Sequence, residues 1–460
     1  MLEGLEVKVL NYSEVLEDNF TYRIDAEFFK KTYLEEEKII AKLGFEEAKN
    51  IIAVKGGKRL PEGHDFLNDK RGIPYIRAED IKNGFVDYNN SPTISLITHR
   101  EIKAYQTEYN DVLMTIVGNS IGDIGIVKFN LDICNLTENA VRLITKKNKI
   151  KPEYLFSFLE SKFGQNYIER NKVGTAQPKL SIERIRKIKI PIISLEVQDE
   201  IEAIVSSAFE KLQKSKEIYQ TAQNLLLEHL GLKDFNPPSQ TVNIKSFTDS
   251  FGTSGRLDAE FYQEKYESYL KKIQAFNNGF VQIQQEYSQV KSKSKFDLPA
   301  YQYIEIGDVN VSDGSYSFNE VAIEDLPANA KIMVKEGDIL ISTVRPNRGA
   351  ITVIEHDRDD LIVSGAFTVL RRKVKSYFNN EFLKVLLRTE IYKDWLLQFN
   401  VGTSYPVIKD EDILNLVIPN VEETIQTQIA DLIRQSDRLR QESQALLEEA
   451  KRKVEQAIEG

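Results

Sequence analysis

Two long stretches of the chain place an apolar or small residue at every third or fourth position. In the first stretch these residues are Val197, Ile201, Ile204, Ala208, Leu212, Ser215, Tyr219, Ala222, Leu226 and Leu230. In the second they are Ile425, Ile429, Leu432, Ser436, Leu439, Ser443, Leu446, Ala450 and Val454. Steps of three and four keep such a stripe on one face of an α-helix. The pattern therefore predicts two long amphipathic helices, at residues 194–232 and 420–460.

The ends of the first predicted helix carry recognisable signals. Ser194 is a suitable N-cap, and Gly231 followed by Pro237 and Pro238 ends the helix. Because each stripe holds only a moderate number of large side chains, each helix needs a partner to bury it. We expect the two helices to pair with each other, antiparallel, over roughly 35 residues or about 50 Å. A single helix that lies on its own domain is the alternative.

The sequence that precedes each long helix reads in the same order in both halves. Each half has a helical pattern, then β-rich sequence bounded by Gly, Asn and Asp, then a second helical stretch, a Gly-Thr loop and a short strand closed by proline. The expected segments are helices at 25–43, 258–276, 152–169 and 380–399, strands at 73–76, 301–304, 111–117 and 338–344, and final strands that end at Pro191 and Pro419.

These parallels reflect a tandem duplication. Arg23-Ile-Asp-Ala-Glu-Phe28 returns as Arg256-Leu-Asp-Ala-Glu-Phe261, and residues 173–201 match residues 401–429 at a constant offset of 228 with ten identities. A shared secondary structure does not produce such a register. The fold class we expect is α+β. Two globular units, residues 1–193 and 241–419, are each followed by a long helix, with a linker at 233–240.

Composition describes an ordinary globular protein in a reducing compartment. Of 460 residues, 41% are hydrophobic and 28% are charged. No apolar run is long enough to span a membrane, and Met1 is not followed by a signal-peptide pattern. The single cysteine, Cys134, cannot form an internal disulfide, so we expect a cytoplasmic protein. The four scattered histidines give no metal-ligand spacing, so no metal site is expected.

Charge is distributed unevenly along the chain. The net charge is −9, yet residues 140–190 contain thirteen Lys and Arg against four acidic residues. A basic stretch inside an acidic chain suits local contact with a polyanion, although an ordinary solvated surface explains it equally well.

Sequence signals for catalysis are absent. Asn236-Pro-Pro-Ser239 is similar to the Asn-Pro-Pro-aromatic motif of adenine methyltransferases, but Ser239 cannot stack on a flipped base. No nucleophile, base and orienting group occur together in a supporting context. We therefore expect a protein that is not an enzyme and that holds no cofactor.

The layout resembles the specificity subunit of type I restriction-modification systems. The residues that carry the resemblance are the Val-Gly-Thr-x-x-Pro loops at 173–178 and 401–406, the strands that end at Pro191 and Pro419, Gln198 and Gln426 at the start of the long helices, and both Arg-x-Asp-Ala-Glu-Phe segments. The resemblance implies two target-recognition domains that each read one half of a split sequence in double-stranded DNA. It also implies that the helix pair sets the distance between the half-sites. Two DNA-methyltransferase subunits and restriction or translocase subunits would bind, and S-adenosylmethionine and ATP would be held by those partners alone.

Direct readout of DNA needs planar donors and acceptors on loops, with cations for the phosphates. In the first unit the candidates are Lys55, Lys58, Arg59, Arg71, Arg77, Asn119, Ser120, Lys172, Gln177 and Lys179. In the second unit they are Lys291, Lys293, Lys295, Arg345, Asn347, Arg348, Ser404 and Tyr405. The framework repeats and the candidate contacts differ, as two readers of different half-sites require. A tandem module that binds glycans or proteins through its tyrosines, with a helical spacer, and a single-chain DNA-acting enzyme are the alternatives.

Overall fold

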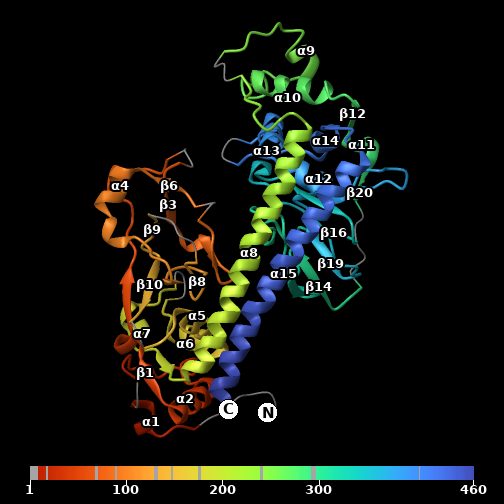
Figure 1. The fold of residues 1–460 in the computed structure, drawn as a ribbon. Coiled ribbons are helices and arrows are strands. Elements are labelled where there is room, and N and C mark those ends of the chain that lie inside the picture. The colour runs from red at the N-terminus through yellow and green to blue at the C-terminus, as the bar shows by residue number, and fades with distance from the viewer. Residues whose placement is uncertain are drawn as a thin grey trace. The chain divides into compact units, whose positions relative to one another are not determined.

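The computed structural model divides the chain into two compact units, each of which includes part of both long helices. Unit 1 comprises residues 1–212 and 440–460, and unit 2 comprises residues 213–439 (Figure 1). The residues that the structure describes are 9–16, 19–67, 71–88, 91–128, 133–146, 149–174, 178–238, 242–291, 297–402 and 405–460.

Unit 1 is a mixed helix and sheet unit. Its elements are α1 (Tyr12–Leu16), α2 (Lys31–Leu43), β1 (Phe45–Glu47), α3 (Ala48–Ile51), β2 (Ile52–Gly56), β3 (Ile73–Ile76), η1 (Ala78–Asp80), β4 (Ile81–Lys82), β5 (Phe85–Val86), β6 (Thr93–Ile94), α4 (Leu96–Glu101), η2 (Lys103–Tyr105), β7 (Val112–Thr115), β8 (Ile124–Ile126), β9 (Asn135–Leu136), β10 (Ala140–Thr145), α5 (Pro152–Glu160), α6 (Lys162–Asn171), α7 (Ile182–Arg186) and β11 (Lys189–Pro191).

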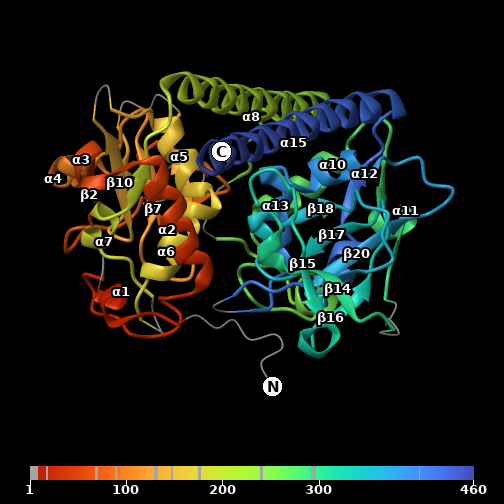
Figure 2. The ribbon, with the colours of Figure 1, turned by 90° about the horizontal axis from the view of Figure 1, so that it is seen from below.

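The centre of unit 1 is an antiparallel sheet in the order β2-β10-β7-β8. Helix α5 lies between this sheet and the C-terminal helix (Figure 2). The core therefore combines sheet residues such as Met114 and Val141 with Tyr154 and Phe158 of α5. A smaller sheet, β6-β3-β9, joins β3 to β9 in parallel.

Unit 2 repeats this order of elements. It contains α9 (Phe251–Ser254), α10 (Glu264–Gln274), β12 (Phe280–Gln282), α11 (Ile283–Glu286), β13 (Tyr287–Gln289), β14 (Ala300–Ile304), η3 (Ile306–Asp308), β15 (Asn319–Ala322), η4 (Ile323–Asp325), β16 (Ala330–Met333), β17 (Ile339–Ser342), η5 (Pro346–Arg348), β18 (Ile351–Val353), β19 (Leu361–Ser364), β20 (Phe367–Arg372), α12 (Asn380–Leu387), α13 (Glu390–Leu396), η6 (Leu397–Phe399), α14 (Asp410–Leu414) and β21 (Val417–Pro419). The sheet β13-β20-β17-β18 corresponds to the central sheet of unit 1, and β15-β14-β19-β16 to its smaller sheet.

Of the four helical stretches expected outside the long helices, two are shorter and two are interrupted. The helices expected from residues 25 and 258 begin only at Lys31 and Glu264, because the Arg-x-Asp-Ala-Glu-Phe segments form turns instead. The helices expected at 152–169 and 380–399 are each broken in two. The breaks occur at Ser161 and Thr389, whose backbones are extended.

The two long helices are α8 (Leu195–His229) and α15 (Glu423–Glu459), and they pack side by side (Figures 1 and 2). Within unit 2 the Ser215 and Ser436 hydroxyls lie 2.9 Å apart, and within unit 1 the Ser443 hydroxyl donates to the Ala208 carbonyl at 2.6 Å. The pairing is antiparallel, as expected, and the small residues in the stripe permit this close approach. The alternative of a helix that lies alone is therefore wrong. The predicted N-cap is also confirmed, since Ser194 Oγ accepts from the Val197 amide at 3.3 Å.

Candidate nucleic-acid interface

In unit 1 the loops that carry most of the candidate residues meet at one edge of the central sheet. Strands β2 and β7 end at this edge, and β10, antiparallel to both, begins there. The Ile116 amide donates to the Asn139 carbonyl and the Leu180 amide to the Ile116 carbonyl, both at 2.9 Å. The Gly118 amide reaches the Pro178 carbonyl at 3.2 Å. The loop after β7 is thereby joined to the segment that follows the Gly-Thr loop.

The Gly-Thr loop of unit 1 is closed at its base. Val173 and Lys179 exchange two backbone hydrogen bonds, at 2.9 and 2.8 Å. Gly174 has φ +97°, which a residue with a side chain adopts only with strain. The repeated glycine thus serves a loop that reverses direction tightly beside the sheet edge.

Unit 2 builds the same joint with the same hydrogen bonds. The Thr343 amide donates to the Ala366 carbonyl at 2.9 Å and the Ile408 amide to the Thr343 carbonyl at 3.0 Å. The Arg345 amide donates to the Pro406 carbonyl at 2.7 Å. A Cβ on Gly402 would lie 2.0 Å from the Tyr405 carbonyl oxygen, so only glycine fits this turn. The joint is a property of the duplicated framework.

The Arg-x-Asp-Ala-Glu-Phe segments brace the chain just before each Gly-Thr loop. The Arg23 guanidinium pairs with Asp25, donates to the Arg170 carbonyl at 2.8 Å and lies 5.0 Å from the centre of the Phe28 ring. Its hydrogen bonds lower the pKa of Asp25. The role of this segment could not be predicted from the sequence, because its partner is about 147 residues away.

The second copy is built alike. Arg256 pairs with Asp258, donates to the Asn400 carbonyl at 2.7 Å and lies 4.6 Å from the centre of the Phe261 ring. The Asn400 side chain in turn accepts from the Gly402 and Val407 amides, at 2.8 and 3.0 Å. Asn400 is therefore a positioning residue for the loop.

Several candidates of unit 1 gather at the joined edge. They are Lys58, Arg59, Arg77, Asn119, Ser120 and Lys179, and Lys55 lies slightly earlier on β2. Arg59 is already paired with Glu138 at 2.6 Å. Burial alone would raise the pKa of Glu138, but hydrogen bonds from Arg59 and Thr137 lower it instead. Arg77 pairs with Glu79 and Asp80. Lys58 and Asn119 are exposed and are the better placed for an external ligand.

Other candidates of unit 1 lie elsewhere or are engaged. Arg71 precedes β3, whereas Arg77 follows it, so Arg71 is at the opposite end of that strand from the joined edge. Lys172 flanks the Gly-Thr loop but pairs with Glu169 at 2.6 Å. Gln177 lies outside the described residues.

In unit 2 the joined edge carries Lys291 after β13, then Arg345, Asn347 and Arg348 after β17, and Tyr405 in the Gly-Thr loop. Lys293, Lys295 and Ser404 lie outside the described residues. Arg345 has φ +49°, a left-handed conformation that costs a residue with a side chain about 1–2 kcal/mol. The matching residue in unit 1 is Gly118, with φ +98°. The joint thus requires a positive φ at this position, and in unit 2 an arginine adopts it.

Several basic residues of the stretch at 140–190 form ion pairs with acidic residues of the same chain. Arg142 is 3% exposed and bonds Asp111 at 2.6 Å, and Arg170 pairs with Glu37 at 3.0 Å. Lysines of the same stretch pair with acidic residues of α8, α15 and β1. Part of the stretch therefore neutralises acids distant in sequence, and contact with a polyanion stays a prediction for the rest, which includes the exposed Lys179.

Among the described residues, no group of three or more His, Cys, Asp and Glu side chains could hold a metal ion. Burial raises the pKa of the Cys134 thiol to about 12, so it stays protonated and unreactive at neutral pH. Within the same residues, no helix is both long enough and apolar enough to cross a membrane.

Two copies of one α+β unit, each with the same loop joint at a sheet edge, define a tandem recognition protein. The family model described as "Type I restriction modification DNA specificity domain" matches residues 45–223 and 272–452. The chain belongs to this family, and it is a non-catalytic DNA-specificity subunit with two recognition domains. Family membership decides against the glycan-binding and single-chain enzyme alternatives.

Similar proteins carry the same description. The type I restriction enzyme MjaVIII specificity subunit of Methanocaldococcus jannaschii is 24% identical over 404 residues, which cover 83% of this chain and 84% of that protein. The EcoBI specificity subunit of Escherichia coli is 32% identical over 30% of this chain and 29% of its own length. A crystal structure of the S subunit from M. genitalium covers 90% of this chain and 95% of its own, at 13% identity and a TM-score of 0.40. Because that score is below 0.5, the assignment rests on the family model.

Proposed function

We propose that the two units read the two halves of a split DNA target and that the α8–α15 pair sets the spacing between the halves. In this proposal the chain also assembles with two DNA-methyltransferase subunits and with restriction or translocase subunits. S-adenosylmethionine and ATP are bound by those partners alone.

The observation that carries the proposal is the repeated joint at the sheet edge. Its backbone bonds are the same in both units, whereas the side chains that it presents differ. Unit 1 offers Lys58 and Asn119, and unit 2 offers Arg345 and Arg348. A shared scaffold with different planar donors is what two readers of different sequences need.

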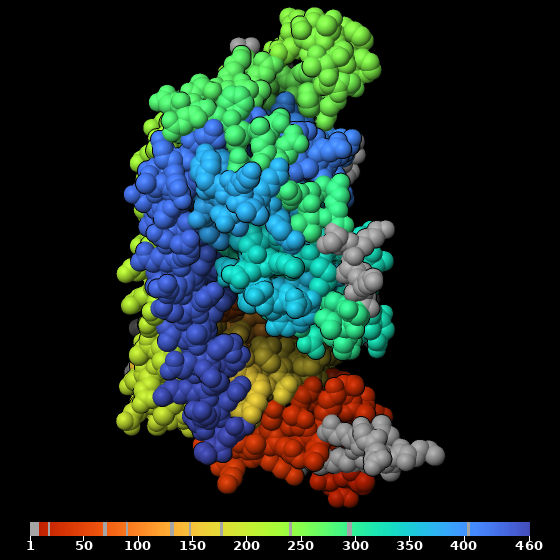
Figure 3. Space-filling model, turned by 90° about the vertical axis from the view of Figure 1, so that its right-hand side faces the viewer, coloured from red at the N-terminus to blue at the C-terminus, as the bar shows by residue number. Residues whose placement is uncertain are grey.

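The helix pair supports the remaining part of the proposal. Much of the length of α15 lies at the surface in Figure 3, and exposed residues recur along it outside the buried stripe. A long paired rod with a solvent-facing side can separate two readers and still offer partner subunits a surface.

Methylation profiling of the host, with and without this gene, tests the proposal as a whole. We expect one split motif to lose its adenine methylation when the gene is deleted, and methyltransferase subunits to purify with a tagged chain. Binding of the purified complex to duplex DNA should weaken steeply as salt rises, because phosphate contacts release counterions. An unchanged set of methylated motifs and no co-purified methyltransferase would contradict the proposal.

A matched insertion tests the spacing function alone. Seven residues are inserted between Leu212 and Gln213 in α8, and seven between Leu439 and Arg440 in α15. These points are the boundaries of the compact units and lie three residues from the paired Ser215 and Ser436, so the contacts within each unit are kept. Seven residues add about 10 Å of helix, or about three base pairs, and preserve the helix phase.

The expected result is a methylated motif with unchanged half-sites and a spacer about three base pairs longer. The control is the insertion in α8 alone, which shifts one stripe against the other and should abolish methylation. A double insertion that is fully active with the original spacer would show that the helices do not set the distance.

A further inference from the structure

The backbone of Arg345 points to a function for its side chain. Among the described residues, four that are not glycine have positive φ, namely Tyr22, Asn83, Asn110 and Arg345. Asparagine tolerates this region, whereas arginine gains nothing from it. Since unit 1 places Gly118 at the same point of the same joint, the framework does not require a side chain here. A strained residue held where glycine would suffice is a mark of function.

The Arg345 side chain is held in place but has free donors. Its guanidinium carbon lies 4.3 Å from the centre of the Tyr405 ring, which belongs to the Gly-Thr loop and is 57% exposed. Within the part of the chain that the structure describes, the guanidinium has no hydrogen bond and no ion pair. By contrast, Arg388 donates to Tyr219 and to backbone carbonyls. Arg345 is thus oriented by stacking, with its N–H groups available to an external ligand.

The two residues are brought together by the joint itself. The Arg345 amide bonds the Pro406 carbonyl, one residue beyond Tyr405. Pro346 fixes the next φ and is buried, and Gly402 allows the close turn that carries Tyr405. Little conformational freedom remains to be lost when a ligand binds.

We propose that Arg345 reads a guanine in the half-site of unit 2, with Tyr405 as the positioning residue that aims its guanidinium. This inference rests on the proposed function of unit 2 as a DNA reader. A planar guanidinium with parallel donors matches guanine O6 and N7 in the major groove, and stacking on an aromatic ring fixes its plane. Arg348 is exposed three residues later, with no ring to stack on among the described residues, and it suits a phosphate.

The test compares the methylated motif of hosts that carry the complete complex with wild-type chain, Arg345→Gly or Arg345→Lys. Arg345→Gly copies unit 1 and relieves the backbone, so the melting temperature should be equal or higher. We expect one guanine position of one half-site to become degenerate in both variants, with discrimination reduced roughly 5- to 150-fold. The other half-site and the spacer should stay the same.

Three further variants separate base reading from general attraction. Arg348→Ala should lower methylation at all sites about equally and leave the motif unchanged. Tyr405→Leu should relax the same position as Arg345→Gly, whereas Tyr405→Phe should keep it.

The outcomes distinguish this inference from the proposed function. If the wild type yields a split motif and Arg345→Gly yields the identical motif, Arg345 contacts phosphate at most and the inference fails while the proposed function stands. If Arg345→Gly abolishes methylation, the sequences that the purified complex selects from a randomised duplex pool decide. A guanine preference that persists there overturns the inference, and its loss at one position supports it. A wild type without any split motif defeats the proposed function instead.

Discussion

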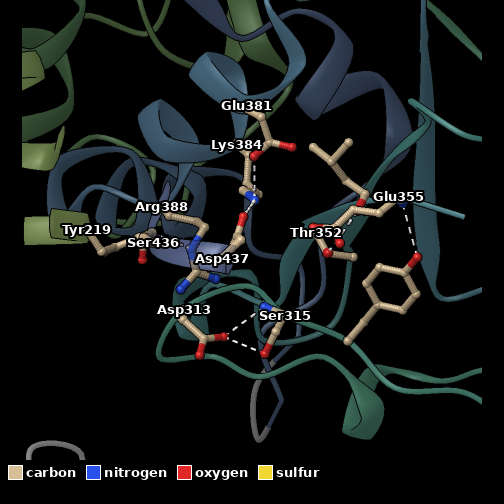
Figure 4. Close-up of polar contacts among 12 residues, drawn as sticks. Tyr219, Asp313, Ser315, Thr352, Glu355, Glu381, Lys384, Arg388, Ser436 and Asp437 are labelled. Carbon is tan, nitrogen blue, oxygen red and sulfur yellow. Dashed lines mark hydrogen bonds and ion pairs between the residues drawn. The ribbon is translucent and has the colours of Figure 1, made fainter. Parts of the chain in front are cut away.

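Unit 1 and unit 2 use different side-chain contacts at matching positions between their sheets and the long helices. Glu153 in α5 and Glu381 in α12 occupy the same place in the repeat, at the offset of 228. In unit 1, Glu153 pairs with Lys128, which lies just after β8, and both side chains are almost fully buried. In unit 2, Glu381 pairs with Lys384 of its own helix, at 2.5 Å (Figure 4).

The residue that matches Lys384 is Phe156, and around it unit 1 is apolar. Phe156 packs in the same core as Leu447 of α15 and Phe209 of α8. The residues at the corresponding helix positions in unit 2 are Tyr219 and Asp437, and Asp437 lies 3.7 Å from the Lys384 ammonium. Burial alone would lower the pKa of Lys384, but the two carboxylates outweigh it and raise that pKa.

At the end of the same helix the two units carry opposite charges. Glu160 in unit 1 matches Arg388 in unit 2. Arg388 donates to Tyr219 of α8 at 2.9 Å, to the Val311 carbonyl at 3.1 Å and to the Gly349 carbonyl. The loop after β17 is thereby tied to a long helix by one side chain. The comparison teaches that a duplicated unit can keep its backbone while its buried side-chain contacts differ. The contacting residues are then replaced together, as a group.

The largest loss of stability should follow when the lysine of the Glu381, Lys384 and Asp437 cluster is placed at the matching position of unit 1. Phe156→Lys buries an ammonium while the matching carboxylate, Glu153, is already paired with Lys128, so it should destabilise unit 1 by about 3–5 kcal/mol. Urea unfolding followed by hydrogen exchange of β7 and β10 measures the change. Phe156→Leu is the control, with an expected cost below about 1.5 kcal/mol. Adding Phe209→Asp should recover part of the loss, and no recovery would show that the sets are not interchangeable.

The reverse exchange should cost unit 2 slightly less. Lys384→Met leaves Glu381 and Asp437 near each other without a cation, so it should destabilise unit 2 by about 3 kcal/mol. Trp395 is the single tryptophan and is buried in unit 2, so its fluorescence reports unfolding of this unit. The triple variant Glu381→Gln, Lys384→Met, Asp437→Asn should restore most of the stability. If Lys384→Met alone is as stable as the wild type, the ion cluster does not stabilise unit 2.

The replacement of Glu160 by Arg388 in the second copy predicts that unit 1 has a pH response that unit 2 does not match. Burial raises the pKa of Glu160 to about 7, so the folded unit 1 binds a proton that the unfolded chain releases near pH 4.5. Stability from this group is therefore present at low pH and is lost as the pH rises through 7. Glu160→Gln should stabilise unit 1 at pH 8 by about 1–3 kcal/mol and have little effect near pH 5. Hydrogen exchange of α5 measures this, and Trp395 fluorescence of unit 2 should show no matching change.

The smallest effect should be shared by both units. Arg23 and Arg256 lower the pKa of Asp25 and Asp258, so each pair adds stability above the ordinary carboxyl pKa that disappears as the pH falls through the lowered value. Because both carboxylates are nearly half exposed, Asp258→Asn should cost no more than about 1 kcal/mol at pH 7. The loss should match that of Asp25→Asn in thermal unfolding. A large difference between the two would mean that the braces are not equivalent.

Much of this molecule follows from pattern. The stripes of the long helices, their pairing, the order of elements and the identity of the Gly-Thr loops follow from local periodicity and from an ungapped repeat. The breaks at Ser161 and Thr389 did not, because the apolar pattern continues through both. For the candidate contact residues, the sequence grouped the loops correctly. It could not separate Arg77 from Arg71, because these two residues are only six positions apart but flank opposite ends of β3.

The sequence by itself determined that one scaffold occurs twice, because identity at a fixed offset needs no coordinates to be recognised. Tertiary structure decided which charges are available. It paired Arg142 and Arg170 of the basic stretch with acidic residues, and it left the guanidinium of Arg345 stacked on Tyr405 without a bonded partner among the described residues. The physical reason is that a charge is neutralised by whatever the fold brings within a few ångströms, and those partners lie far away along the chain.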